Sequence, residues 1–142
     1  MMWEIPMLVA GGLFAGVVTF VAWERIPAWR AMDLVEFRRH FGHSIRRADR
    51  LQPAVLIAWL VSTVAFAITN GGAARAVALA GAVALVLTLV GSGAYLVPLQ
   101  RRLVAGAVQD PEGGRRRWYR GHLARTALAL ASLALVAIAA AL

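Results

Sequence analysis

The sequence predicts an all-α integral membrane protein: a four-helix bundle with both termini outside and an amphipathic helical segment on the cytoplasmic side, between the first and second spans. Hydrophobic residues make up 61% of the 142-residue chain, and its mean hydropathy is +0.69. Soluble domains are about 45–50% apolar, so the excess predicts surface that faces lipid. The charge pattern agrees, because 13 of the 15 basic residues lie in two segments, 24–50 and 99–122, separated by nearly uncharged stretches.

The nearly uncharged stretches predict four spans in a single domain over residues 1–142. Each is close to the ~20 residues that a helix needs to cross ~30 Å of hydrocarbon. Helices are expected because a backbone in lipid must satisfy its own hydrogen bonds. In chain order, the predicted spans are 5–23, 53–69, 76–98 and 123–142.

The two arginine-rich connections predict the orientation. Two spans separate them, so they lie on the same side, and the positive-inside rule places that side in the cytoplasm. The expected location is the cell (inner) membrane, as a multi-pass protein. The first apolar stretch has no positive residues before it and does not resemble a cleaved signal peptide. The short connection Asn70–Arg75 predicts that spans two and three are antiparallel neighbours.

Small residues indicate candidate helix contacts in the spans. Gly12 and Gly16 form a Gly-x-x-x-Gly pair in span one, which is a candidate face for a homo-oligomer. Gly81, Gly91 and Gly93 occur in span three. The alternative is that all of these glycines serve packing within the bundle.

Residues 28–51 predict an amphipathic helical segment between Pro27 and Pro53. It is expected to lie on the membrane surface or to fold over the inner mouth of the bundle. Its polar face consists of Asp33, Glu36, His40, His43, Arg47 and Arg50. Its apolar face consists of Leu34, Phe37, Phe41, Ile45 and Ala48.

Three residues of this segment have a spacing that suits a metal. Glu36, His40 and His43 follow an i, i+4, i+7 pattern, and His122 lies on the same side of the membrane. Two or three histidines with a carboxylate are typical ligands of copper, iron or zinc. Two alternatives stay open: a metal-free polar cluster that lines a pocket, and plain interfacial anchoring with charge pairs along the helix.

Two charged residues lie at the inner membrane boundary. Glu24 directly follows span one, and an acid at membrane depth is usually functional or paired. Arg125 lies one turn into span four, where it either extends to the interface or reaches a carboxylate such as Glu24. The spans contain no chain of buried acids and no ion filter, which argues against a pump or channel. The net charge of +8 flanks the spans without a nucleic-acid motif, so nucleic acid is not an expected partner.

Three segments together resemble the anthrone oxygenase-like family of small four-span membrane proteins, a family of domains of unknown function. Leu13-Phe14-Ala15-Gly16 is similar to its glycine-containing opening. Val97–Leu103 is similar to its Pro-x-Asn-x-x-Leu element, although Gln100 replaces the asparagine. Trp118–Thr126 is similar to its Trp…His-x-x-Arg-Thr entry into span four.

The resemblance implies oxygenation of an aromatic polyketide at an activated methylene. It implies roles for Gln100 and Trp118 in substrate binding, with Trp23 as a further ring for stacking. His122 is a candidate general base or metal ligand, Arg125 a candidate holder of the resulting anion, and Glu24 a further catalytic candidate.

We therefore expect a membrane oxidoreductase or oxygenase that acts on a small lipophilic aromatic substrate, with or without a histidine-bound metal. The alternative is a non-enzymatic accessory or scaffold protein that binds anionic lipid or a partner through its arginine-rich loops.

Overall fold

The computed structural model describes residues 2–142, except for the side chain of Asp49, and this part of the chain is entirely helical apart from short turns. Two of the segments are single π-helical stretches, η1 and η2, each continuous with the helices on both sides. In chain order the elements are α1 (Glu4–Phe20), η1 (Val21–Arg25), α2 (Ile26–Ala31), α3 (Leu34–Thr69), α4 (Gly72–Gly91), η2 (Ser92–Leu96), α5 (Val97–Ala105) and α6 (Pro111–Ala141).

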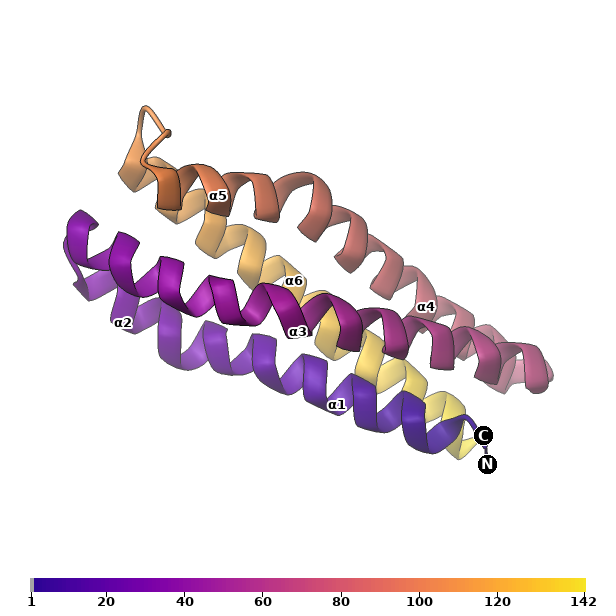
Figure 1. Cartoon of the computed structure of the whole chain (residues 1–142). Coiled ribbons are helices and arrows are strands. Elements are labelled where there is room, and N and C mark those ends of the chain that lie inside the picture. Colours follow the sequence, from indigo (N-terminus) through magenta and orange to yellow (C-terminus); the bar gives the residue numbers. More distant parts are fainter. Residues whose placement is uncertain (1) are drawn as a thin grey trace.

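These elements form two long helical hairpins that pack into one elongated bundle (Figure 1). The α1–α2 rod packs against α3, the α4–α5 rod packs against α6, and both termini lie at the same end. Four helical rods of the described chain are long and apolar enough to cross a membrane: Glu4–Ala31, Arg50–Thr69, Gly72–Ala105 and Pro111–Ala141. The chain is thus an all-α, multi-pass membrane protein, as the hydropathy predicted.

The core has two halves of different composition. Toward the termini it is mainly aliphatic, with Trp59 as its largest side chain, packed against Phe14. Toward the other end it is aromatic, and its rings meet mostly edge to face, a geometry that aromatic pairs prefer. The aromatic half consists of Trp29, Phe37, Phe41, Trp118 and Tyr119 with Ile26, Leu96 and Leu103.

The amphipathic segment between the first two spans is part of the second span's own helix. The side chain of Asp33 caps the start of α3 by accepting hydrogen bonds from the amides of Val35 and Glu36. The helix then continues through Pro53 for 36 residues, or about 54 Å at 1.5 Å per residue. The expectation that Pro53 opens a separate helix is therefore wrong. The predicted faces are confirmed, since Phe37 and Phe41 are buried and the polar positions are exposed.

The two hairpins share a local design that the sequence pattern alone did not reveal. Each π-helical segment is followed two residues later by a proline, Pro27 after η1 and Pro98 after η2. A proline lacks an N–H and its ring clashes with the carbonyl four residues earlier, and a wider π turn accommodates both defects. After each proline, a short helix ends and an aspartate, Asp33 or Asp110, caps the long returning helix.

A buried arginine joins the two hairpins at the end of the bundle remote from the termini. Arg115 in α6 donates hydrogen bonds to the backbone oxygens of Trp29 (3.2 Å) and Met32 (2.9 Å), where α2 ends. It also forms an ion pair with Glu112 at 2.8 Å, and its guanidinium lies over the ring of Phe37. Carbonyls at the end of α2 thus accept hydrogen bonds from the other hairpin, although that of Trp29 also accepts one from the Met32 amide (3.4 Å).

The glycines divide into those that face another helix and those that do not. Gly81 lies against α6, where its carbonyl accepts a hydrogen bond from Ser132 (3.0 Å) and a Cβ would come within 2.9 Å of Val136. Gly12 and Gly16 are exposed, and a Cβ at either position would meet no atom within 4 Å. They therefore do not pack within this bundle, and their role in a homo-oligomer stays a prediction.

We expect Gly81→Leu to destabilise the bundle by about 1–3 kcal/mol, because the added side chain overpacks the α4–α6 contact. Thermal unfolding of the detergent-solubilised protein, followed by tryptophan fluorescence, measures this effect. Gly91→Leu is the matched control, since a Cβ at Gly91 meets no atom within 4 Å. Equal melting temperatures for the two variants would contradict the assigned packing.

Candidate functional site

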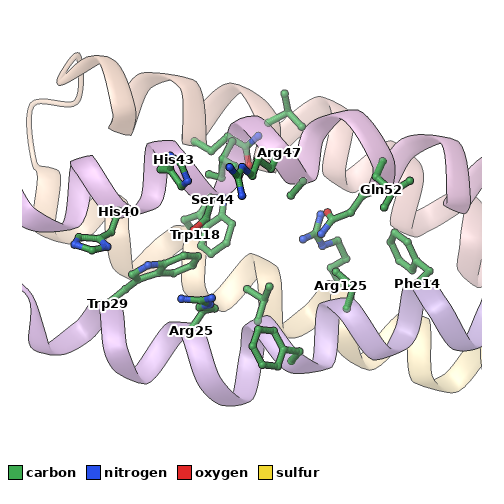
Figure 2. Close-up of a pocket in the computed structure, with 18 of the residues that line it drawn as sticks. Phe14, Arg25, Trp29, His40, His43, Ser44, Arg47, Gln52, Trp118 and Arg125 are labelled. Atoms are coloured by element: carbon green, nitrogen blue, oxygen red, sulfur yellow. The ribbon is translucent and has the colours of Figure 1, made fainter.

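A groove of about 830 Å³ lies in the half of the bundle remote from the termini, between the α1–η1–α2 rod and α3, with α6 behind it (Figure 2). It extends from Arg25 and Trp29 to Leu13 and Phe14. Its apolar lining consists of Leu13, Phe14, Val17, Phe20, Val21, Trp29, Ile45, Ala48, Leu51, Val55, Val97 and Trp118. Several of these side chains, such as Leu13 and Leu51, are also exposed on the outside of the bundle, so the groove is open toward the membrane.

Two tryptophans from different helices form an aromatic wall in this groove. Trp29 from α2 and Trp118 from α6 lie with ring centroids 6.0 Å apart, and both pack edge to face on Phe41. Trp118 also stacks on His122, with centroids 5.1 Å apart and planes 21° from parallel. Both tryptophans are nearly fully buried, so their positions are well defined by their neighbours.

Beyond this wall, Arg125 reaches the groove and is held by His122. Its Nη2 lies 2.9 Å from Nδ1 of His122, whose Nε2 lies 3.0 Å from the backbone oxygen of Val18. A guanidinium only donates hydrogen bonds, so Nδ1 must accept and Nε2 must carry the hydrogen that it donates to Val18. Both ring nitrogens of the buried His122 are thus engaged, in a neutral tautomer. Thr126 adds a donor to the same Val18 oxygen at 3.3 Å.

The end of the groove remote from the termini is basic. Arg25 from η1 faces His40, His43 and Arg47 from α3 across the opening, and Arg39 also lines the groove. The guanidinium of Arg25 also lies 5.6 Å from the centre of the Phe20 ring. The basic side chains are therefore concentrated toward one end, while the lining near Phe14 is mainly apolar apart from Arg125 and Gln52.

The structure brings together some of the predicted site residues and separates others. Gln100, Trp118 and Arg125 line the groove, and Gln100 is buried. His122 lies directly behind Trp118 and Arg125. Trp23, Glu24 and Glu36 are exposed and do not belong to the groove lining, and the Trp23 side chain is 84% exposed.

The four predicted metal ligands do not fit a metal. His40, His43 and Glu36 lie exposed on α3, whereas His122 is buried, with both of its nitrogens in hydrogen bonds. Within residues 2–142 as described, no group of three or more histidine, aspartate or glutamate side chains is placed to hold a metal ion. His40 and His43 share one face of α3, but His122 is buried between helices and lies in a different environment.

Several lining residues were not identified from the sequence as site residues. Phe14, Arg25, Trp29, Arg39 and Gln52 come from four different elements, and no motif or spacing connects them. The irregular turn of η1 changes which side chains face inward after Val21, so simple helical periodicity does not place Arg25 or Trp29 in the groove.

Comparisons with known proteins provide no further identification. No family model, no curated protein and no solved structure matches this chain.

We expect His122→Ala to destabilise the protein by roughly 1–3 kcal/mol, because it removes hydrogen bonds to a buried carbonyl and to a guanidinium. It also removes the surface on which Trp118 stacks. Thermal unfolding in detergent measures the loss. His40→Ala is the control, because His40 is exposed on α3 and its removal should leave the melting temperature unchanged. A silent His122→Ala variant would contradict the hydrogen-bonding role.

Proposed function

We propose that this chain is a membrane-embedded oxidoreductase of the oxygenase type that binds a small lipophilic aromatic substrate in the groove. The observation that carries the proposal is an arginine set into an aromatic, largely apolar groove that opens toward lipid. A volume of about 830 Å³ is within the range of small-molecule sites, roughly 300–1,000 Å³.

The lining favours a flat, apolar substrate. Trp29, Trp118 and Phe14 contribute parts of their largely buried rings to the groove wall, which favours contact with a bound aromatic system. The exposed side chains at the opening, including Val17 and Phe20, are apolar, so a lipophilic molecule can enter sideways from the membrane. In this proposal the substrate enters the groove from the lipid and not from water.

Arg125 supplies the electrostatic contribution to the proposed reaction. A phenol or activated methylene bound beside its guanidinium is more acidic, because the cation stabilises the oxyanion that forms. His122 is a positioning residue in this scheme: it accepts a hydrogen bond from Arg125 and keeps the guanidinium directed to the groove. This role replaces that of general base, since its ring nitrogens are both occupied.

The reaction class rests on the resemblance to the anthrone oxygenase-like family. For an anthrone, the balanced reaction is anthrone plus dioxygen to anthraquinone plus water, in which the methylene is oxidised and dioxygen is reduced. The anthrone loses its methylene proton to solvent at the open end of the groove. The resulting anion is the electron-rich form that dioxygen oxidises, and holding this anion is the contribution that Arg125 makes. No step of this scheme passes through a metal.

We expect purified wild-type protein to convert an anthrone to the anthraquinone faster than the spontaneous oxidation. Arg125→Met should reduce the rate above the spontaneous oxidation at least about tenfold, which corresponds to a loss of roughly 1.4 kcal/mol of transition-state stabilisation. Oxygen uptake and quinone absorbance measure the reaction. Glu24→Gln is the control, since Glu24 is exposed and outside the groove lining. A wild-type rate equal to the spontaneous rate would contradict the enzymatic proposal.

The alternative function is that of an accessory protein that binds anionic lipid or a partner. The observation in its favour is that Arg101 and Arg102 on α5 are exposed and lie outside the groove. Such side chains interact with anionic lipid headgroups at the membrane surface. In this case Arg101→Glu/Arg102→Glu would abolish partner or lipid binding, while Arg125→Met would have no effect on it.

We also propose that the protein lies in the cell membrane with both termini outside, because the arginine-rich ends of both hairpins meet at the opposite end of the bundle. The chain contains no cysteine, so single-cysteine variants report topology directly. We expect Ala73→Cys to react with an impermeant maleimide in intact cells and Arg116→Cys to react only after permeabilisation. The reverse pattern would overturn the orientation.

A further inference from the structure

A second, smaller hollow adjoins the groove on α3, beside the middle of the groove's length. It has a volume of about 320 Å³ and is lined by four basic side chains, His43, Arg46, Arg47 and Arg50. These residues follow an i, i+3, i+4, i+7 pattern on α3, so they lie on one face of the helix. All four are exposed.

The hollow and the groove share part of their lining. His43 and Arg47 line both of them, and Ala48 and Leu51, in the same stretch of α3, line the groove. An apolar body in the groove and an acidic group in the hollow would therefore contact adjacent positions of one helix. Figure 2 shows His43 and Arg47 on the α3 side of the groove, opposite Arg25.

The position of the hollow along α3 suits a charged group. Arg50 is the first residue of the apolar stretch Arg50–Thr69, so the hollow lies where the helix passes from the aqueous to the hydrocarbon environment. An anion there remains partly hydrated. Arginine binds carboxylates and phosphates through paired hydrogen bonds, which are stronger near the interface than in bulk water.

We propose that the ligand of the groove is an acidic amphiphile, whose aromatic body lies in the groove and whose carboxylate or phosphate lies in the basic hollow formed by His43, Arg46, Arg47 and Arg50. This inference rests on the proposed function, which places an aromatic molecule in the groove. It adds a second anchoring point, because Arg125 lines the groove itself and the basic hollow adjoins the groove on α3. The acidic group selects the molecule over neutral aromatics of equal size.

The test uses two probes with the same apolar body, pyrenebutyrate and the neutral pyrenebutanol. The protein is reconstituted in nanodiscs of zwitterionic lipid, and binding is measured by energy transfer from tryptophan, since Trp29 and Trp118 line the groove. The variant is Arg46→Gln/Arg50→Gln, which changes residues that line the basic hollow but not the groove. The control variant is Arg116→Gln/Arg117→Gln, an equal loss of charge at exposed positions of α6 outside both cavities.

We expect Arg46→Gln/Arg50→Gln to weaken pyrenebutyrate binding about tenfold, as for the loss of charge-assisted hydrogen bonds. Pyrenebutanol binding should stay at the wild-type level, which also shows that the variant is folded. The control variant should bind both probes like wild type. The binding of each probe is compared between the variant and the wild type, so differences in membrane partitioning between the two probes do not affect the result.

Three outcomes overturn the inference while leaving the proposed function intact. The first is unchanged pyrenebutyrate binding in Arg46→Gln/Arg50→Gln, and the second is an equal loss of binding in the control variant. The third is that the difference in pyrenebutyrate binding between wild type and Arg46→Gln/Arg50→Gln disappears in nanodiscs of phosphatidylglycerol, which would assign the hollow to bulk lipid headgroups. Failure of both probes to bind wild-type protein would instead contradict the proposed function itself.

Discussion

The structure depends on one constraint, that backbone polar groups inside a membrane must find partners within the protein. Helices satisfy this for the backbone, and several buried hydroxyls are paired in a similar way, by donating back to carbonyls of their own helix. Thr63 donates to Trp59, and Thr88 to Ala84, each at 2.8 Å. Ser132 instead donates across to Gly81 and so couples α6 to α4. A hydrogen bond between helices of this kind fixes a contact that packing alone would leave free to slide.

The half of the bundle at the arginine-rich end differs from the half near the termini. Near the termini, small and aliphatic side chains close the bundle. Toward the arginine-rich end, the prolines and π turns of both hairpins lie at similar positions, and bulky rings occupy the core. Arg115 joins these ends by satisfying the carbonyls of Trp29 and Met32. The groove forms in this half, between a rod with an irregular turn and the long helix α3 (Figure 1).

The histidines show how far reasoning from sequence extends. His40 and His43 are one turn apart on a helix face that periodicity predicted, and both line the groove. His122 was grouped with them because all three lie in the same half of the membrane. Its actual partners, Val18 and Arg125, come from α1 and from its own helix. Membrane depth is readable from hydropathy, but the direction of a side chain within the bundle depends on which helix packs beside it.

The sequence by itself determined the helical class, the four apolar rods, the end at which charge accumulates, and the buried and exposed faces of residues 34–50. Each follows from local composition and periodicity, and lipid leaves few alternatives to a helix. Only the tertiary structure decided that α3 is continuous through Pro53, that Gly81 rather than Gly12 receives a neighbouring helix, and that Arg125 reaches a groove with His122 behind it. These depend on the pairing and rotation of helices, which non-local packing sets.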